Sequence, residues 1–195
     1  MRKLFMLLSL LAIFGCAETR VTSIKSISHG KYSKVLLMAS FDDLQLQSDY
    51  ESALDNALYS RGVASIRGID VFPPLRTYSD SEVNAGIKKL NVDAILVLTP
   101  NGTTTGSSTS YSALTGHYNT NQTVTGIFSE ISLRDVRSGQ QVYRASISTS
   151  LSELTSSSEA LNDAASKLCD DLWKNNFLTT SIKPKRHSPN PYDNN

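Results

Sequence analysis

The sequence predicts a single α/β domain in which three helices pack on one mixed β-sheet. Two observations predict this fold class. In the first half of the chain, short apolar runs of strand length alternate with amphipathic stretches of helix length. In the second half, an alternating hairpin pattern is followed by one long amphipathic stretch. The predicted order is β-α-β-α-β-β-β-α, an α+β arrangement with helices packed on the sheet.

The first strand is predicted at 35–39, where apolar residues follow one another without a break. A capping-box pattern at 48–51, Ser-Asp-Tyr-Glu, predicts that a helix begins there, and Gly62 predicts its end. A brief second strand follows at 63–66. The two prolines of 72–75 exclude helix and predict a rigid extended loop.

A second capping box at 79–82 predicts the next helix, and its apolar stripe consists of Val83, Ile87 and Leu90. The apolar run at 93–98 predicts a strand, which we expect to stop at Pro100. Strands joined by helical connections of this length pair in parallel through right-handed crossovers.

Residues 101–120 are rich in Gly, Ser and Thr and predict a flexible polar loop. Tyr111, Leu114 and Tyr118 stand out in it. Aromatic side chains in an otherwise polar loop are favoured interface anchors, so these three are candidate partner-binding residues. The alternative is that they fold back on the sheet.

Alternation returns at 123–133 and at 143–149, on either side of turn residues at 135–140, and predicts an antiparallel hairpin. A third capping box at 156–159 begins the last helix. Its stripe includes Cys169, which we expect to be a small buried hydrophobe. Residues 179–195 lose periodicity and are expected to form a disordered tail.

The first residues have the pattern of a secretory signal peptide. Arg2 and Lys3 precede an apolar run at 4–14 that is interrupted only by Ser9. As a helix this run is about 16 Å long, too short for a hydrocarbon core of about 30 Å. We therefore predict a signal peptide at 1–15 rather than a permanent membrane helix.

The residues Ile13-Phe14-Gly15-Cys16 resemble the lipobox of bacterial lipoproteins, with the bulky Phe14 as the one departure. The resemblance implies cleavage before Cys16, acyl chains on that cysteine and a membrane anchor. A competing reading is an ordinary signal peptidase site with Gly15 and Ala17 as its small residues. In lipoproteins an Asp after the cysteine signals inner-membrane retention, so Ala17 implies the outer membrane, facing the periplasm.

Residues 16–33 are then expected to be a polar tether, and 34–178 the single periplasmic domain. The spacing of Val21, Ile24 and Ile27 leaves a short edge strand or a helical turn within the tether as an alternative.

Composition excludes several functions. The chain has 19 basic and 18 acidic residues; removal of Arg2 and Lys3 leaves 17 against 18, a net charge of −1, which does not favour nucleic acid. The three histidines, His29, His117 and His187, have no neighbours at metal-ligand spacing, so we expect neither a metal nor a cofactor.

Two stretches carry a family resemblance. Residues 88–97 are similar to the helix, short turn and Asp-Ala-hydrophobic strand of small envelope lipoproteins, and 133–143 to their Leu-x-Asp-x-x-Ser-Gly hairpin. Over 34–175 the chain resembles the group of the curli secretion lipoprotein, the TolB amino-terminal domain and lipoprotein activators of cell-wall synthases. That group shares no catalytic residues and works by binding partners or assembling into envelope machines. In contrast to the curli-type proteins, 102–125 lacks the sustained alternation of a pore-forming hairpin.

The resemblance implies a non-enzymatic envelope lipoprotein that binds a periplasmic or outer-membrane partner or forms a homo-oligomer. The alternative is a small-ligand-binding or hydrolytic domain that uses the carboxyl end of the sheet, near Asp42, Asp43, Thr99 and Asn101. Adjacent carboxylates after a strand are more often turn and capping groups than an acid-base pair.

Overall fold

The computed structural model describes residues 18–26, 30–41, 43–112, 117–151 and 157–181. The strands are β1 (Glu18–Lys25), β2 (Lys34–Ala39), β3 (Ala64–Arg67), β4 (Ala94–Ser112), β5 (His117–Asp135) and β6 (Gln141–Leu151). The helices are α2 (Leu44–Ser60), α3 (Gly68–Val71), α4 (Asp80–Leu90) and α5 (Ser157–Lys174). From β2 onward the predicted order is confirmed, with the one-turn helix α3 added.

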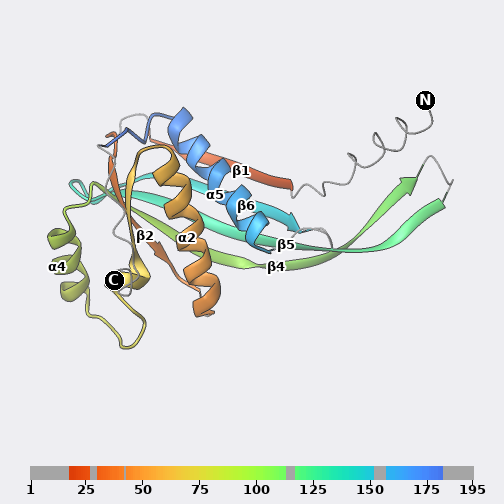
Figure 1. The fold of residues 1–195 in the computed structure, drawn as a ribbon, viewed down its shortest axis with the longest axis horizontal. Coiled ribbons are helices and arrows are strands. Elements are labelled where there is room, and N and C mark those ends of the chain that lie inside the picture. The colour runs from red at the N-terminus through yellow and green to blue at the C-terminus, as the bar shows by residue number, and fades with distance from the viewer. Residues whose placement is uncertain (1–17, 27–29, 42, 113–116, 152–156, 182–195) are drawn as a thin grey trace, which may run out of the picture.

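The described strands form one mixed sheet in the order β1-β6-β5-β4-β2-β3 (Figure 1). β2 pairs in parallel with both β3 and β4, as the helical connections predicted. β4, β5, β6 and β1 pair antiparallel. In the described part of the chain, no helix is long and apolar enough to cross a membrane.

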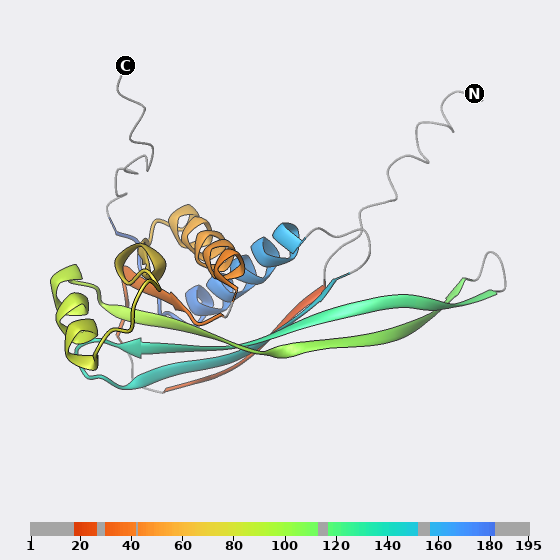
Figure 2. The same ribbon diagram turned by 90° about the horizontal axis from the view of Figure 1, so that it is seen from below.

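Helices α2 and α5 lie side by side on one face of the sheet (Figure 2). The main core lies between them and the strands, and Cys169 is fully buried in it. α4 contributes Ile87 to a smaller apolar cluster that includes Leu36 of β2 and Val92. Burying these apolar side chains is the principal stabilising term for the domain.

Helix α2 begins five residues earlier than the capping box at 48–51 predicted, when the two N-cap positions are compared. Its N-cap is Asp43, whose carboxylate accepts hydrogen bonds from the backbone N–H groups of Gln45 and Leu46 at 2.8 and 3.1 Å. Glu51, the last residue of the predicted box, instead lies within α2, and its side chain is fully buried. The predicted end is confirmed: Gly62 follows the helix with a φ of 75°.

The capping box at Ser79 is confirmed: its side chain accepts from Glu82 N–H, and Glu82 accepts from Ser79 N–H. The turn between β5 and β6 is confirmed as well, with Asp135 accepting from Ser138 N–H at 2.7 Å. The beginning of the third box, at Ser156, lies outside the described residues.

The prediction that Pro100 stops a strand is wrong. β4 continues to Ser112, and the loop expected at 101–120 is instead largely β-structure of β4 and β5. Leu98 C=O accepts from Ser40 N–H, which follows β2. Successive residues of a strand direct their backbone groups to opposite sides, so the even-numbered residues near Leu98 face β2. Pro100 is the next such residue, and β2 has already ended at Ala39. Its missing N–H therefore costs no hydrogen bond to another strand.

The polar tether expected at 16–33 is also wrong for its first half. Residues 18–25 form the edge strand β1, the alternative that the apolar spacing had left open, and β1 pairs with β6 over its whole length. At the other end, Thr179 N–H donates to Tyr32 C=O and Ser181 N–H to Gly62 C=O. Residues 179–181 of the expected tail are therefore held to the domain, and the rest of it, 182–195, lies outside the described residues.

Candidate functional site

The most distinctive feature of the structure is a two-stranded ribbon, which we define as residues 106–112 of β4 and 117–124 of β5. β2 pairs with β4 only as far as Leu98, and β6 pairs with β5 only from Thr125. Between these limits and the tip, the described strands provide no third partner for the ribbon. It extends well beyond the helices and the rest of the sheet (Figures 1 and 2).

The ribbon is uncharged. No Asp, Glu, Lys or Arg occurs between Ala94 and Ser129, and Ser, Thr, Asn and Gly predominate. Natural proteins usually protect exposed strand edges with charged residues, lysine above all. A long edge without them is suited to contact with another molecule.

The three predicted anchor residues belong to the end of this ribbon. Tyr111 and Tyr118 are cross-strand partners, and Ser112 opposite His117 is the last pair before the turn. Leu114 lies outside the described residues. The structure thus brings two of the three together, and it does so through strand pairing rather than through the loop that the sequence predicted.

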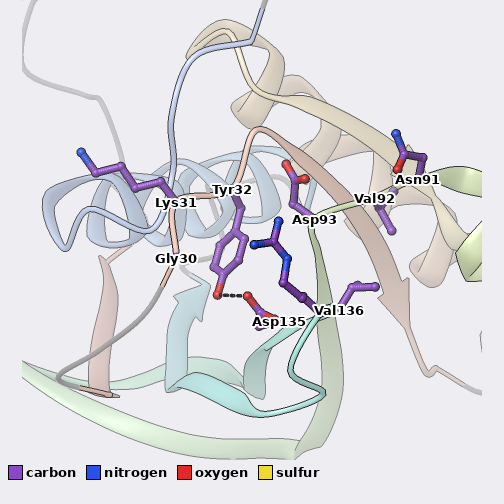
Figure 3. Close-up of a pocket in the computed structure, with 9 residues that line it drawn as sticks. Gly30, Lys31, Tyr32, Asn91, Val92, Asp93, Asp135 and Val136 are labelled. Carbon is purple, nitrogen blue, oxygen red and sulfur yellow. Dashed lines mark hydrogen bonds between the residues drawn. The ribbon is translucent and has the colours of Figure 1, made fainter.

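A polar pocket of about 400 Å³ lies at the opposite end of the sheet, where three chain segments meet (Figure 3). Tyr32, Asp93 and Asp135 line it, together with Gly30, Lys31, Asn91, Val92, Val136 and Arg137. The Tyr32 hydroxyl donates to Asp135 Oδ2 at 3.0 Å. Asp93 Oδ2 accepts from Ser33 N–H and Oγ–H, both at 2.8 Å, and from Lys34 N–H at 3.0 Å.

The electrostatics of this pocket follow from those contacts. Burial, and then the hydrogen bond to Asp135, raise the pKa of Tyr32 to about 12. Burial alone would raise the pKa of Asp93, but hydrogen bonds from Ser33 and Lys34 outweigh it and the pKa is lowered. The N–H of Ser138 is the largest cause that lowers the pKa of Asp135.

Asp93 and Asp135 are the aspartates of the two sequence motifs, and the structure brings both to one pocket. Their carboxylates are occupied by donors from neighbouring turns, so they hold chain segments in place. Sequence reasoning placed each in its own turn but missed Tyr32, which connects Asp135 to the segment before β2.

A half-exposed, largely apolar groove of about 440 Å³ lies at the carboxyl end of β2. Its lining includes Met38, Phe41, Phe72, Val83 and Val97. Glu51 is also among the lining residues, and its carboxylate accepts from Ala39 N–H at 3.1 Å and from Ile69 N–H at 2.9 Å. This contact connects α2 to the ends of β2 and β3.

The residues proposed for a ligand site at this end of the sheet are not gathered in the groove. Asp43 is committed to capping α2 and is absent from the groove lining. Thr99 is exposed, and the Asn101 side chain bonds Glu130. Asp42 lies outside the described residues, as does Cys16. Among the described side chains, no group of three His, Cys, Asp or Glu is placed to hold a metal ion.

No protein-family model and no curated protein matches this sequence. Solved structures match in fold. PelC from Paraburkholderia phytofirmans, solved as a dodecamer, is 15% identical with a TM-score of 0.51, and the match covers 80% of this chain and 97% of PelC.

Two further matches are named as lipoproteins. GNA1162 from Neisseria meningitidis is 16% identical with a TM-score of 0.45, covering 73% of this chain and 99% of its own. A minor lipoprotein from Acinetobacter baumannii is 14% identical with a TM-score of 0.40, covering 75% and 97%. At such identities the likeness to PelC establishes a shared fold, and the two weaker matches carry no further argument.

Proposed function

We propose that this protein is a lipid-anchored, non-enzymatic component of the bacterial envelope that binds a partner complex through the ribbon. The observation that carries the proposal is the pairing of the ribbon: among the described strands, residues 106–112 and 117–124 pair only with each other. An isolated two-stranded hairpin is at best marginally stable in water. Contact with a partner would supply the burial that the ribbon lacks on its own.

The proposed anchor is the acylated Cys16, in the outer membrane and with the domain in the periplasm. The lipobox-like residues 13–16 support it, because a cysteine directly behind a short apolar run is what lipoprotein processing requires. Replacement Cys16→Ser is expected to abolish acylation, measured by mass spectrometry of the mature amino-terminal peptide. Normal processing of that variant before Glu18 would instead establish the ordinary signal peptide.

Further copies of this chain are among the proposed partners. The support is the shared fold with PelC, which was solved as a dodecamer. Light scattering on the acylated protein in detergent is expected to give a mass several times the 21.3 kDa of the full chain. A monomer at every concentration would remove self-assembly from the proposal.

The groove near Phe41 and Phe72 favours a second candidate function, the binding of an apolar ligand. Its half-exposed apolar side chains would contact such a ligand, whereas Asp43 is not placed to act on one. This candidate predicts that Val97→Asp impairs function while a shortened ribbon does not.

A register-preserving deletion tests the ribbon directly. Gly106 and Ser107 pair with Val124 and Thr123, so removing both two-residue segments shortens the ribbon by about 7 Å. The deletion keeps the remaining side chains on their faces and leaves the pairing of β6 untouched. In-cell crosslinking followed by mass spectrometry should recover the partner with the full-length chain and lose it with the shortened one. Equal recovery from both would overturn the proposal, provided that both chains unfold at the same temperature.

A further inference from the structure

The position of the anchor relative to the ribbon follows from the strand register. Glu18, the first residue of β1, pairs with Ser150 of β6, Ser150 with Gly126 of β5, and Gly126 with Thr104 of β4. The chain therefore enters the sheet at the level of Thr104, on the side from which the ribbon leaves. Figure 1 draws the red beginning of β1 on that side.

The anchor has little freedom to move from this level. Cys16 precedes Glu18 by two residues, a reach of at most about 7 Å. β1 occupies the residues expected to form a long tether, and its pairing with β6 fixes them to the domain. The membrane that holds the acyl chains therefore lies close to the end of the sheet where the ribbon begins.

The ribbon continues past this level. From Thr104 to Ser112 there are eight residues, which at strand spacing extend about 26 Å further in the direction of the anchor. The anchor lies only two residues before Glu18, so the membrane is close to the level of Thr104. A ribbon that extends about 26 Å beyond that level on the side of the anchor therefore meets the lipid.

We infer that the ribbon rests on the surface of the membrane that anchors Cys16, and that its end, at the pair Tyr111 and Tyr118, contacts the lipid headgroup region. The inference relies on the lipid anchor of the proposed function and adds the orientation of the domain. A lone ribbon does not cross the hydrocarbon, because its open edges would leave N–H and C=O groups unpaired there. The domain is consequently tilted, with the ribbon along the interface.

The composition of the ribbon is suited to this contact. The absence of Asp, Glu, Lys and Arg between Ala94 and Ser129 removes the cost of bringing charges to the lipid. Tyr111 and Tyr118 lie at its end, and tyrosine is enriched at membrane interfaces. Because the ribbon carries no basic residue, its contact does not depend on anionic lipid.

Fluorescence quenching by lipid tests the orientation. In a Cys169→Ala background, a fluorophore is attached at Ser110→Cys in the ribbon or at Gln140→Cys in the exposed turn at the opposite end of the sheet. The acylated proteins are reconstituted into phosphatidylethanolamine vesicles that contain nitroxide-labelled lipid, with and without phosphatidylglycerol. The Ser110 label should lose fluorescence and the Gln140 label should not, equally in both vesicle types.

Three outcomes would overturn the inference. An unquenched Ser110 label on acylated, vesicle-bound protein would leave the anchor in place and show that the ribbon is held away from the lipid. Equal quenching at both positions would place the whole domain on the lipid. A protein that carries no acyl chains, shown by mass spectrometry, would refute the anchor of the proposed function as well.

Discussion

Tyr111 of β4 and Tyr118 of β5 are cross-strand partners, one pair inside the end of the ribbon. The sequence presents them as two aromatic residues of a polar loop, seven positions apart. Strand pairing brings them to a common position about 23 Å beyond the level at which the chain enters the sheet. The two residues therefore form one unit at the end of the ribbon.

The double replacement Tyr111→Ser and Tyr118→Ser should weaken partner recovery while leaving folding intact. Removing aromatic anchors from an interface commonly costs 2 kcal/mol or more of binding. The ribbon lies beyond the core between the sheet and α2 and α5, so the midpoint of thermal unfolding should not change. Recovery is measured by in-cell crosslinking, with Tyr78→Ser, in the loop before α4, as a control that should retain the partner.

Gly68→Ala should destabilise the domain by about 2 kcal/mol or more. A Cβ atom at this position would lie 2.6 Å from the carbonyl oxygen of Leu37, and a backbone atom cannot move aside as a side chain can. Urea denaturation gives the difference in the free energy of unfolding.

Gly139→Ala is the matched control for Gly68→Ala. A Cβ atom there meets nothing within 4 Å, so the positive φ of 70° is the remaining cost, roughly 1 kcal/mol. If both variants lost the same stability, the close approach of Gly68 to β2 would not be the cause.

Tyr32→Phe should lower stability by about 1 kcal/mol near neutral pH, because it removes the hydrogen bond to Asp135. The pKa of Tyr32 is raised from 10 to about 12, so the contribution of the hydroxyl is complete below pH 10 and is lost as the pH rises through 12. The difference in the free energy of unfolding between the two proteins should therefore shrink over that range. A difference that stays constant would contradict the raised pKa.

Glu82 gives the opposite pH dependence. Hydrogen bonds from Arg76, then from the N–H and hydroxyl of Ser79, lower the pKa of Glu82 from 4.5 to about 2. A carboxyl whose folded pKa is depressed stabilises the fold above its unfolded pKa and stops doing so as the pH falls through the folded one. Between pH 4.5 and 2, the wild type should lose more stability than Glu82→Gln in acid titrations of unfolding. Parallel curves would exclude this contribution.

The helices and strands of the core were predictable because their apolar periodicity matches the faces they bury. Ser79 and Gly62 were predictable for a similar reason, since each satisfies backbone groups within a few residues of itself. Asp43 was not. The capping box at 48–51 is the stronger local signal, and Glu51 is instead held by Ala39 and Ile69 from other elements.

The ribbon and β1 could not be read from local sequence because their pairing is non-local. Pro100 is compatible with β4 only because β2 ends before it, a fact that no window around Pro100 contains. β1 is a strand because β6 offers it an edge from far along the chain, as in the pair Ile24 and Arg144, whose sequence separation is 120. The convergence of Asp93 and Asp135 on one pocket likewise requires the folded sheet.

Site-specific photocrosslinking in cells tests the central claim most directly. A photoreactive amino acid replaces Tyr111 at the ribbon end or, as a control, Leu75, which is 88% exposed on the loop before α4. The account predicts crosslinks from position 111 to an envelope component, whether lipid, partner protein or a second copy, and none of these from position 75. Crosslinks from Leu75 with none from position 111 would show that the ribbon is not the binding surface.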